Sequence, residues 1–71
     1  MNYFVITSLG RQAIPMLRTK GEDDKAEILS FLRKRAATIE QISDVTQIEY
    51  STVALEFKQL RREGWVREKR L

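Results

Sequence analysis

The alternation of apolar and polar residues along the chain predicts four helices between two short strands. Residues 3–7 are aromatic and β-branched, as strands prefer, and residues 65–69 begin with apolar–polar alternation. Between them, apolar residues recur every three or four positions, which is the spacing of one helical face. The four predicted helices are 8–17, 24–35, 39–46 and 50–63. We therefore expect a mainly α fold with a small β component.

The first predicted helix combines an apolar face with two residues that weaken helices. Its apolar face consists of Leu9, Ala13, Ile14 and Leu17. Gly10 has little helix propensity, and Pro15 lacks the backbone donor that continues a helix. We therefore expect the helix to bend or end at Pro15, with residues 19–21 linking it to the next helix.

Two pairs of residues have the spacing of a capping box, in which two side chains three positions apart bond to each other's backbone amides. Asp24 with Glu27 predicts the start of the second helix, and Thr38 with Gln41 predicts the start of the third. We expect Gly64 to end the fourth helix in the left-handed conformation. The predicted apolar stripe of the third helix consists of Ile39, Ile42 and Val45.

The last two predicted helices are joined by the short turn 47–49, which indicates a helix-turn-helix. The inward face of helix 50–63 consists of Val53, Phe57 and Leu60. At about 100° per residue, the opposite face consists of Ser51, Leu55, Lys58 and Arg62, flanked by Thr52 and Gln59. Hydroxyl, amide and cationic groups contact bases and phosphates, and Leu55 offers an apolar contact for a thymine methyl group.

Composition narrows the possible functions. The 71 residues are the size of one small domain, and we expect residues 1–71 to form it. The chain has no cysteine and no histidine, which excludes a zinc site built on those residues and a histidine-dependent catalytic triad. We expect neither enzymatic activity nor a cofactor. Because no apolar run approaches the ~20 residues of a membrane span and no basic leader begins the chain, we expect a cytoplasmic protein without membrane contact.

The net charge of +3 is unevenly distributed. Residues 1–20 and 51–71 each carry +3, whereas residues 36–50 carry −3. A phosphate-binding surface is therefore expected in the last third of the chain, where Arg67 and Lys69 follow the fourth helix. Glu49 and Glu56 bracket the first half of the outward face of that helix, where they would repel phosphate.

Residues 38–66 resemble the winged helix-turn-helix of bacterial and archaeal repressors of the ArsR and MarR type. The residues that carry the resemblance are Ile42-Ser43, Ile48, Ser51-Thr52-Val53, Phe57, Leu60 and Gly64-Trp65-Val66. The resemblance implies a small transcriptional regulator that reads duplex DNA with helix 50–63. It does not imply metal sensing, because the metal-sensing branch uses cysteine and histidine. The predicted nucleic-acid-binding residues are Tyr50, Ser51, Thr52, Leu55, Lys58, Gln59, Arg62, Arg67 and Lys69.

A second resemblance covers residues 3–11. Their order, aromatic-x-hydrophobic-Thr-x-x-Gly-Arg, is similar to a segment found beside many winged-helix domains, including that of the phenylalanyl-tRNA synthetase alpha subunit. Such modules contact tRNA, so an RNA-binding accessory domain stays open as an alternative. A protein-interaction module that uses Leu55, Tyr50 and the acidic helix 39–46 is the other alternative. The sequence leaves open whether the protein is a monomer or a homodimer.

A complete wing needs two strands joined by a turn, and only one predicted strand follows helix 50–63. We therefore expect residues 3–7 to pair antiparallel with residues 65–70, so that the two ends of the chain form a two-stranded sheet in place of the wing. We expect Trp65, at the start of the second strand, to pack on the core rather than stack on a base.

Overall fold

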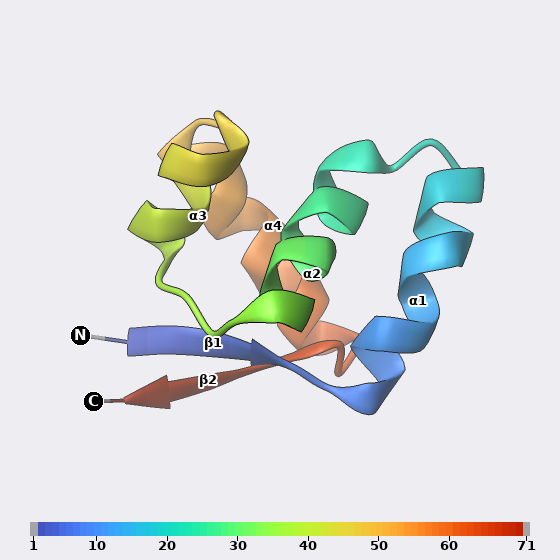
Figure 1. Cartoon of the computed structure of the whole chain (residues 1–71), viewed down its shortest axis with the longest axis horizontal. Coiled ribbons are helices and arrows are strands. Elements are labelled where there is room, and N and C mark those ends of the chain that lie inside the picture. The colour runs from blue at the N-terminus through green and yellow to red at the C-terminus, as the bar shows by residue number, and fades with distance from the viewer. Residues whose placement is uncertain (1, 71) are drawn as a thin grey trace.

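Four helices lie on one side of a two-stranded antiparallel sheet in the computed structural model, which describes residues 2–70 (Figure 1). In chain order the elements are β1 (Asn2–Ile6), α1 (Ser8–Thr19), α2 (Asp23–Lys34), α3 (Ile39–Thr46), α4 (Tyr50–Arg62) and β2 (Val66–Arg70). The prediction of a mainly helical fold with a small sheet is confirmed. Within residues 2–70, no helix combines the length and the apolar character needed to cross a membrane.

The sheet joins the two ends of the described chain. β1 and β2 pair antiparallel along their whole length, with Phe4 opposite Glu68. Phe4 also exchanges two backbone hydrogen bonds with Ala37, in the segment between α2 and α3, at N–O distances of 2.8 and 3.2 Å. β1 therefore lies between β2 and Ala37. The predicted pairing of the two chain ends is confirmed, and the additional contact with Ala37 had no signal in the sequence.

A stack of two phenylalanines joins the sheet to α4. The rings of Phe4 and Phe57 lie within 20° of parallel, with their centroids 4.0 Å apart. Val53 and Leu60 flank Phe57 on α4, and all three are buried as predicted. Trp65 packs against the edge of the core and is half-buried. The other buried residues of the core are Ala13, Ile14, Leu17, Ala26, Ile28, Leu29, Leu32, Ala37, Ile42 and Val66.

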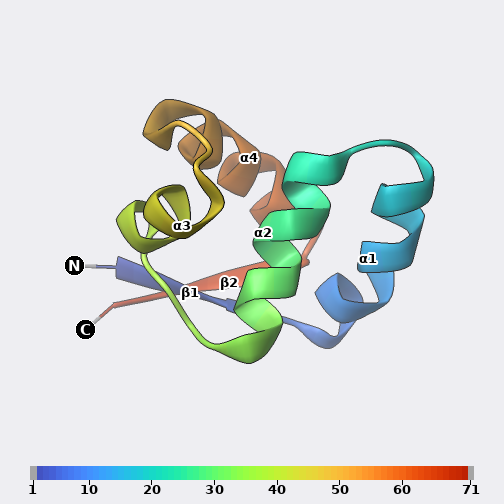
Figure 2. The same ribbon diagram turned by 45° about the horizontal axis from the view of Figure 1, so that its top comes forward.

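α2 occupies the centre of the helical layer, between α1 and α3 (Figure 2). It begins at Asp23, with Glu22 as the N-cap residue and no side-chain cap bond. The capping box predicted at Asp24 is therefore wrong. The chain reverses at Gly21, whose φ is +80°, and the helix starts early enough to place both aspartates in its first turn. There their charges interact favourably with the helix dipole.

α3 begins with the predicted capping box. The side-chain oxygen of Thr38 accepts a hydrogen bond from Gln41 N at 3.1 Å, and Gln41 Oε1 accepts one from Thr38 N at 3.0 Å. The predicted apolar stripe is correct at Ile42, which is buried, and at Ile39, which is half-buried, but Val45 is 60% exposed. A spacing of three residues drifts by about 60° per step around a helix, which carries the last member away from the core.

Of the predicted bend or end at Pro15, the end is wrong, because α1 runs through Pro15 to Thr19. Pro15 is exposed, on the side of the helix where water can bond to a carbonyl that lacks its helical partner. On the other side, Ile14 and Leu17 are buried and pack α1 against α2. Tertiary packing therefore outweighs the local preference of proline.

The first turn of α1 packs against the backbone that connects α4 to β2. Gly10 is buried there, whereas Leu9, which was predicted to face the core, is 57% exposed. A Cβ atom on Gly10 would lie 2.2 Å from the carbonyl oxygen of Trp65, so only glycine fits at this position. Because the helix turns Gly10 towards Trp65, the neighbouring Leu9 points outward.

Thr7, predicted as the last residue of the strand, is instead the N-cap of α1 and completes this contact. Its side-chain oxygen accepts a hydrogen bond from Gly10 N at 3.1 Å and donates one to the carbonyl of Gly64 at 2.7 Å. Its backbone N–H donates to the carbonyl of Trp65 at 3.0 Å. Gly64 has a φ of +78°, as predicted for a left-handed helix end. We call these four residues, Thr7, Gly10, Gly64 and Trp65, the end junction.

We predict that Phe57→Ala and Leu32→Ala each lower the free energy of unfolding by about 2–5 kcal/mol, because both truncations leave cavities in the core. Such a loss is comparable to the whole stability of a core this small, so both variants should be largely unfolded at room temperature. Urea unfolding followed by circular dichroism measures the loss. As a control, Leu55→Ala at a side chain that is 62% exposed should change stability by less than about 0.5 kcal/mol.

Gly10→Ala tests the end junction through the sign of its effect. Helix propensity alone predicts that alanine stabilises α1 by about 1 kcal/mol. The clash with the Trp65 carbonyl predicts instead a loss of about 1–3 kcal/mol in the free energy of unfolding. The control is Gln12→Ala at an exposed position of the same helix. A stabilised Gly10→Ala protein in urea unfolding would show that the two backbones do not approach as closely as described.

Candidate nucleic-acid interface

Side-chain hydrogen bonds fix the turn between α3 and α4. Ser43 Oγ donates to the carbonyl of Ile48 at 2.6 Å. Thr46 Oγ1 donates to the carbonyl of Ile42 at 2.7 Å and accepts from Ile48 N at 3.3 Å. Gln47 takes the left-handed conformation that the reversal needs, with a φ of +62°. Since Ile48 also packs against the core, the turn sets the direction of α4 relative to α3.

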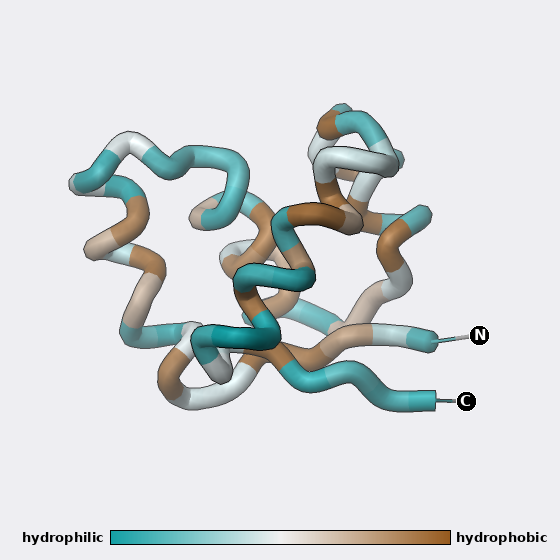
Figure 3. The backbone as a smooth tube through the Cα atoms, turned by 180° about the vertical axis from the view of Figure 1, so that it is seen from behind, coloured by the Kyte–Doolittle hydropathy of each residue, from teal (hydrophilic) through white to brown (hydrophobic). Residues whose placement is uncertain are grey.

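The face of α4 opposite the core is open to solvent. α4 lies behind α2 in Figure 1 and comes to the front when the molecule is seen from behind in Figure 3, where much of its tube is hydrophilic. We call this surface the outer face of α4; it consists of Ser51, Leu55, Lys58 and Arg62, all exposed as predicted. Of the two flanking residues, Gln59 is exposed and Thr52 is half-buried.

The cations of the outer face are available for a partner. Among the ion pairs in residues 2–70, none involves Lys58 or Arg62. Arg61, which directly precedes Arg62 on α4, is paired with Glu68 of β2 at a distance of 2.9 Å between Nη1 and Oε1. Glu68 also accepts a hydrogen bond from the side chain of Asn2. α4 is thus tied to the sheet by one of its arginines and leaves its other basic groups free within the described chain.

A second group of cations lies along the open edge of β2. Arg61, Arg67 and Arg70 line one shallow groove there, together with Asn2, Val66 and Glu68. The sequence analysis included Arg67 among the nucleic-acid-binding residues but not Arg70. Nothing in the sequence shows which residues lie beside the last side chain of a strand. Arg67 and Arg70 form no ion pair within residues 2–70, so this groove has a net positive charge.

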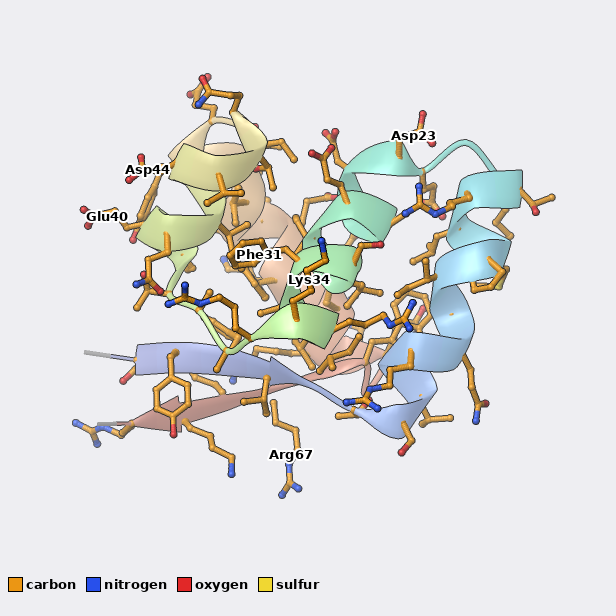
Figure 4. The ribbon with its side chains drawn as sticks, in the orientation of Figure 1. Asp23, Phe31, Lys34, Glu40, Asp44 and Arg67 are labelled. Carbon is orange, nitrogen blue, oxygen red and sulfur yellow. The ribbon has the colours of Figure 1, made fainter. Side chains whose placement is uncertain are left out.

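Arg67 and Lys69 project from the face of the sheet that the helices leave uncovered. Residues alternate between the faces of a strand, and the two cations alternate with the buried Val66 and with Glu68. Figure 4 shows Arg67 pointing away from the helices. The structure therefore does not bring this pair onto the outer face of α4 with Lys58 and Arg62, which the predicted site had grouped together.

The C-terminal half of α4 adjoins α1 through a groove that the sequence did not predict. Gln59 and Arg62 of α4 line it with Met16 of α1, with Lys20 just after α1, and with Trp65. Lys20 thus adds a cation beside Arg62, and the carboxylates of Glu22 and Glu63 line the same groove. No local pattern could show this, because the groove is lined by residues far apart in the sequence.

The first turn of α4 is a less favourable place for phosphate. Tyr50 is 54% exposed and lines a groove with Glu40 and Glu68 at the ends of the strands. Ser51 donates its hydroxyl to Glu49 Oε1 at 2.9 Å, so that hydroxyl already has a partner. The carboxylate of Glu49 is exposed, and the repulsion of phosphate expected there stays a prediction. The cationic half of α4 is therefore its C-terminal half.

The other carboxylate that was expected to repel phosphate, Glu56, has a different place. It is half-buried and pairs with Lys25 of α2 at 3.2 Å, on the flank of α4 that packs against α2. Lys25 also pairs with Glu22 at 3.2 Å. Burial by itself would lower the pKa of Lys25, but its hydrogen bonds to the two carboxylates outweigh burial and raise the pKa above its usual 10.5.

Comparison of the chain with protein-family models, with curated proteins and with solved structures finds no match.

We predict that Glu56→Gln lowers the free energy of unfolding by about 1–2 kcal/mol near pH 7, because it leaves Lys25 with one carboxylate. Since the pKa of Lys25 is raised in the folded state, this stabilisation is present at neutral pH and is lost as pH rises through that pKa. The gap between the two proteins in urea unfolding should therefore close as pH rises through the raised pKa of Lys25. Glu63→Gln, at an exposed residue without an ion pair in residues 2–70, is the control.

Proposed function

We propose that the protein is a winged-helix DNA-binding module, a small transcriptional regulator that reads duplex DNA with the outer face of α4. The arrangement of α3, a fixed turn and α4 supports it, because α3 braces α4 while the outer face stays exposed. The sheet also supports it. β1 lies between Ala37 and β2, in the position of the second strand of a wing.

The observation that carries the proposal is the set of exposed cations without a carboxylate partner on α4 and β2. Within residues 2–70 these are Lys58, Arg62, Arg67, Lys69 and Arg70. Exposed ion pairs add little to stability, typically about 0–1 kcal/mol, so charge density of this kind is not needed for folding. Neutralising phosphates and releasing their counterions is the interaction that such a set favours most.

The residues divide into two roles under this proposal. Lys58 and Arg62, one turn apart on the outer face, neutralise phosphates or read guanine in the major groove. Ser51, Leu55 and Gln59 meet base edges beside them. Arg67 and Lys69 lie on the face of the sheet that the helices leave uncovered and hold the flanking backbone, which positions α4 without reading sequence. We propose binding and no catalysis, since the chain has neither histidine nor cysteine.

A protein partner is the second candidate, because the outer face also carries an exposed leucine. Leu55 is 62% exposed and Tyr50, one and a half turns before it, is 54% exposed. An apolar contact centred on Leu55 would depend little on salt, whereas nucleic-acid binding weakens steeply as salt rises. Titrations of duplex DNA and structured RNA over a range of salt concentrations therefore separate the protein, DNA and RNA hypotheses.

We predict that Arg67→Ala with Lys69→Ala weakens binding to all duplexes alike and lowers the slope of log K against log salt by about 2. Arg62→Ala should instead change the preference among sequences, by about 1–3 kcal/mol at one or two base pairs. Fluorescence anisotropy with labelled duplexes measures both. The control removes one exposed cation from α1 and one from α2, Arg11→Ala with Arg33→Ala, and should leave the slope unchanged. Binding to nucleic acid is strong at low salt, so if duplex affinity is undetectable at ~50 mM salt the proposal fails. A protein contact centred on Leu55 then becomes the better hypothesis.

A further inference from the structure

The exposed side of α2 carries a stripe of charge that changes sign along the helix. Positions 23, 27, 31 and 34 recur every three or four residues, which places them on one side of the helix, and Asp24 and Arg35 adjoin the two ends of this row. We call it the α2 stripe; it consists of Asp23, Asp24, Glu27, Phe31, Lys34 and Arg35 at the end of the helix. Figure 4 shows Asp23 at one end of α2, with Phe31 and Lys34 towards the other.

The charges of the α2 stripe are not neutralised within the chain. No ion pair in residues 2–70 involves Asp23, Glu27 or Lys34, and the same holds for Asp24 and Arg35. The helix dipole favours acids in the first turn and bases in the last, which accounts for the two ends. It does not account for Glu27, which lies beyond the first turn and repels Asp23 four residues before it.

The middle of the stripe is apolar. Phe31 is half-buried and, with Val45 of α3, lines a groove between the two helices. Val45 is 60% exposed, so the apolar lining of this groove is open to solvent. Arg35 and Asp44 line the same groove, so its apolar floor has charged borders of both signs. An aromatic centre with charged borders is the composition of an interface between proteins.

We propose that the α2 stripe binds the α2 stripe of a second copy of this chain, with the two helices antiparallel. In that arrangement the acidic half of each helix meets the basic end of the other. A two-fold axis repeats every contact. When Asp23 of the first copy faces Lys34 of the second copy, Lys34 of the first copy therefore faces Asp23 of the second. The axis then crosses the helix midway between positions 23 and 34. At 1.5 Å per residue this point is about 4 Å from Phe31 along the helix, and the rings of the two copies lie on either side of it.

A second copy fits this surface better than an unrelated partner because the stripe is complementary to itself. A uniformly acidic or basic partner would match one half of the stripe and repel the other half. In the orientation of Figure 1, Phe31 and Lys34 of α2 lie in front of α4 (Figure 4), whereas α4 comes to the front in the rear view of Figure 3. Self-association therefore leaves α4 free, and it does not depend on the function proposed for α4.

Sedimentation equilibrium over a range of protein concentrations tests the proposal with two charge-reversed variants. The unchanged protein should approach twice the 8.3 kDa of one chain, less readily as salt rises. Asp23→Lys with Glu27→Lys makes the stripe basic, and Lys34→Glu with Arg35→Glu makes it acidic, so each variant alone should stay at 8.3 kDa. Mixed in equal amounts, the two should associate one to one, because one stripe is now basic and the other acidic.

The matched control is Lys58→Glu with Arg62→Glu, on the other side of the molecule, which should keep the self-association. It changes the net charge by the same amount as Lys34→Glu with Arg35→Glu. Circular dichroism confirms that each variant is folded, and the mixing experiment separates a lost contact from a lost fold. The proposal is wrong if the unchanged protein stays at 8.3 kDa at every concentration. It is equally wrong if both charge-reversed variants associate as the unchanged protein does.

Discussion

The contact between Gly10 and the carbonyl of Trp65 determines how the two ends of the chain meet. A glycine at this position lets the first turn of α1 lie directly on the backbone that leaves α4. Thr7 then bonds to both Gly64 and Trp65, so β1 begins its pairing with β2 from a fixed point. That pairing places Phe4 against Phe57, and the stack in turn orients α4. The exposed surface of α4 therefore depends on a residue from the other end of the chain.

Two ion pairs on opposite flanks of α4 explain which of its charges remain exposed. Glu56 is held by Lys25 of α2, and Arg61 is held by Glu68 of β2. The carboxylate that would oppose phosphate is thus turned towards the helical layer, and one arginine ties the helix to the sheet. What remains on the outer face is the pair of unpartnered cations Lys58 and Arg62, so the net positive charge of α4 lies on its exposed side. The proposed function depends on this sorting of charges, which composition alone does not reveal.

The sequence predicts those features that depend on neighbours along the chain. The helices, the cap at Thr38 and the left-handed Gly64 each follow from a local pattern, and the antiparallel sheet follows from the need of one strand for a partner. Apart from that sheet, contacts between distant elements could not be predicted. Leu9 and Val45 were misplaced because a helical spacing fixes a face only to within a residue, and the core decides which. The groove shared by Lys20 and Arg62 likewise brings together residues that are far apart in the sequence.

The pairing of β1 with β2 places residues 2 and 70 opposite each other, at the same end of the sheet (Figure 1). A short turn joining them would make a hairpin, and a new opening at the exposed loop around Gly21 would then give the order α2, α3, α4, β2, β1, α1. In that circular permutant the sheet would close locally, directly after α4. The order of the described chain instead requires its two ends to meet in the sheet, while α1 stays next to α2 along the chain. Because α1 packs against α2, the permutant would have to bring its own two ends together in that contact, so the change of order exchanges one long-range contact for another.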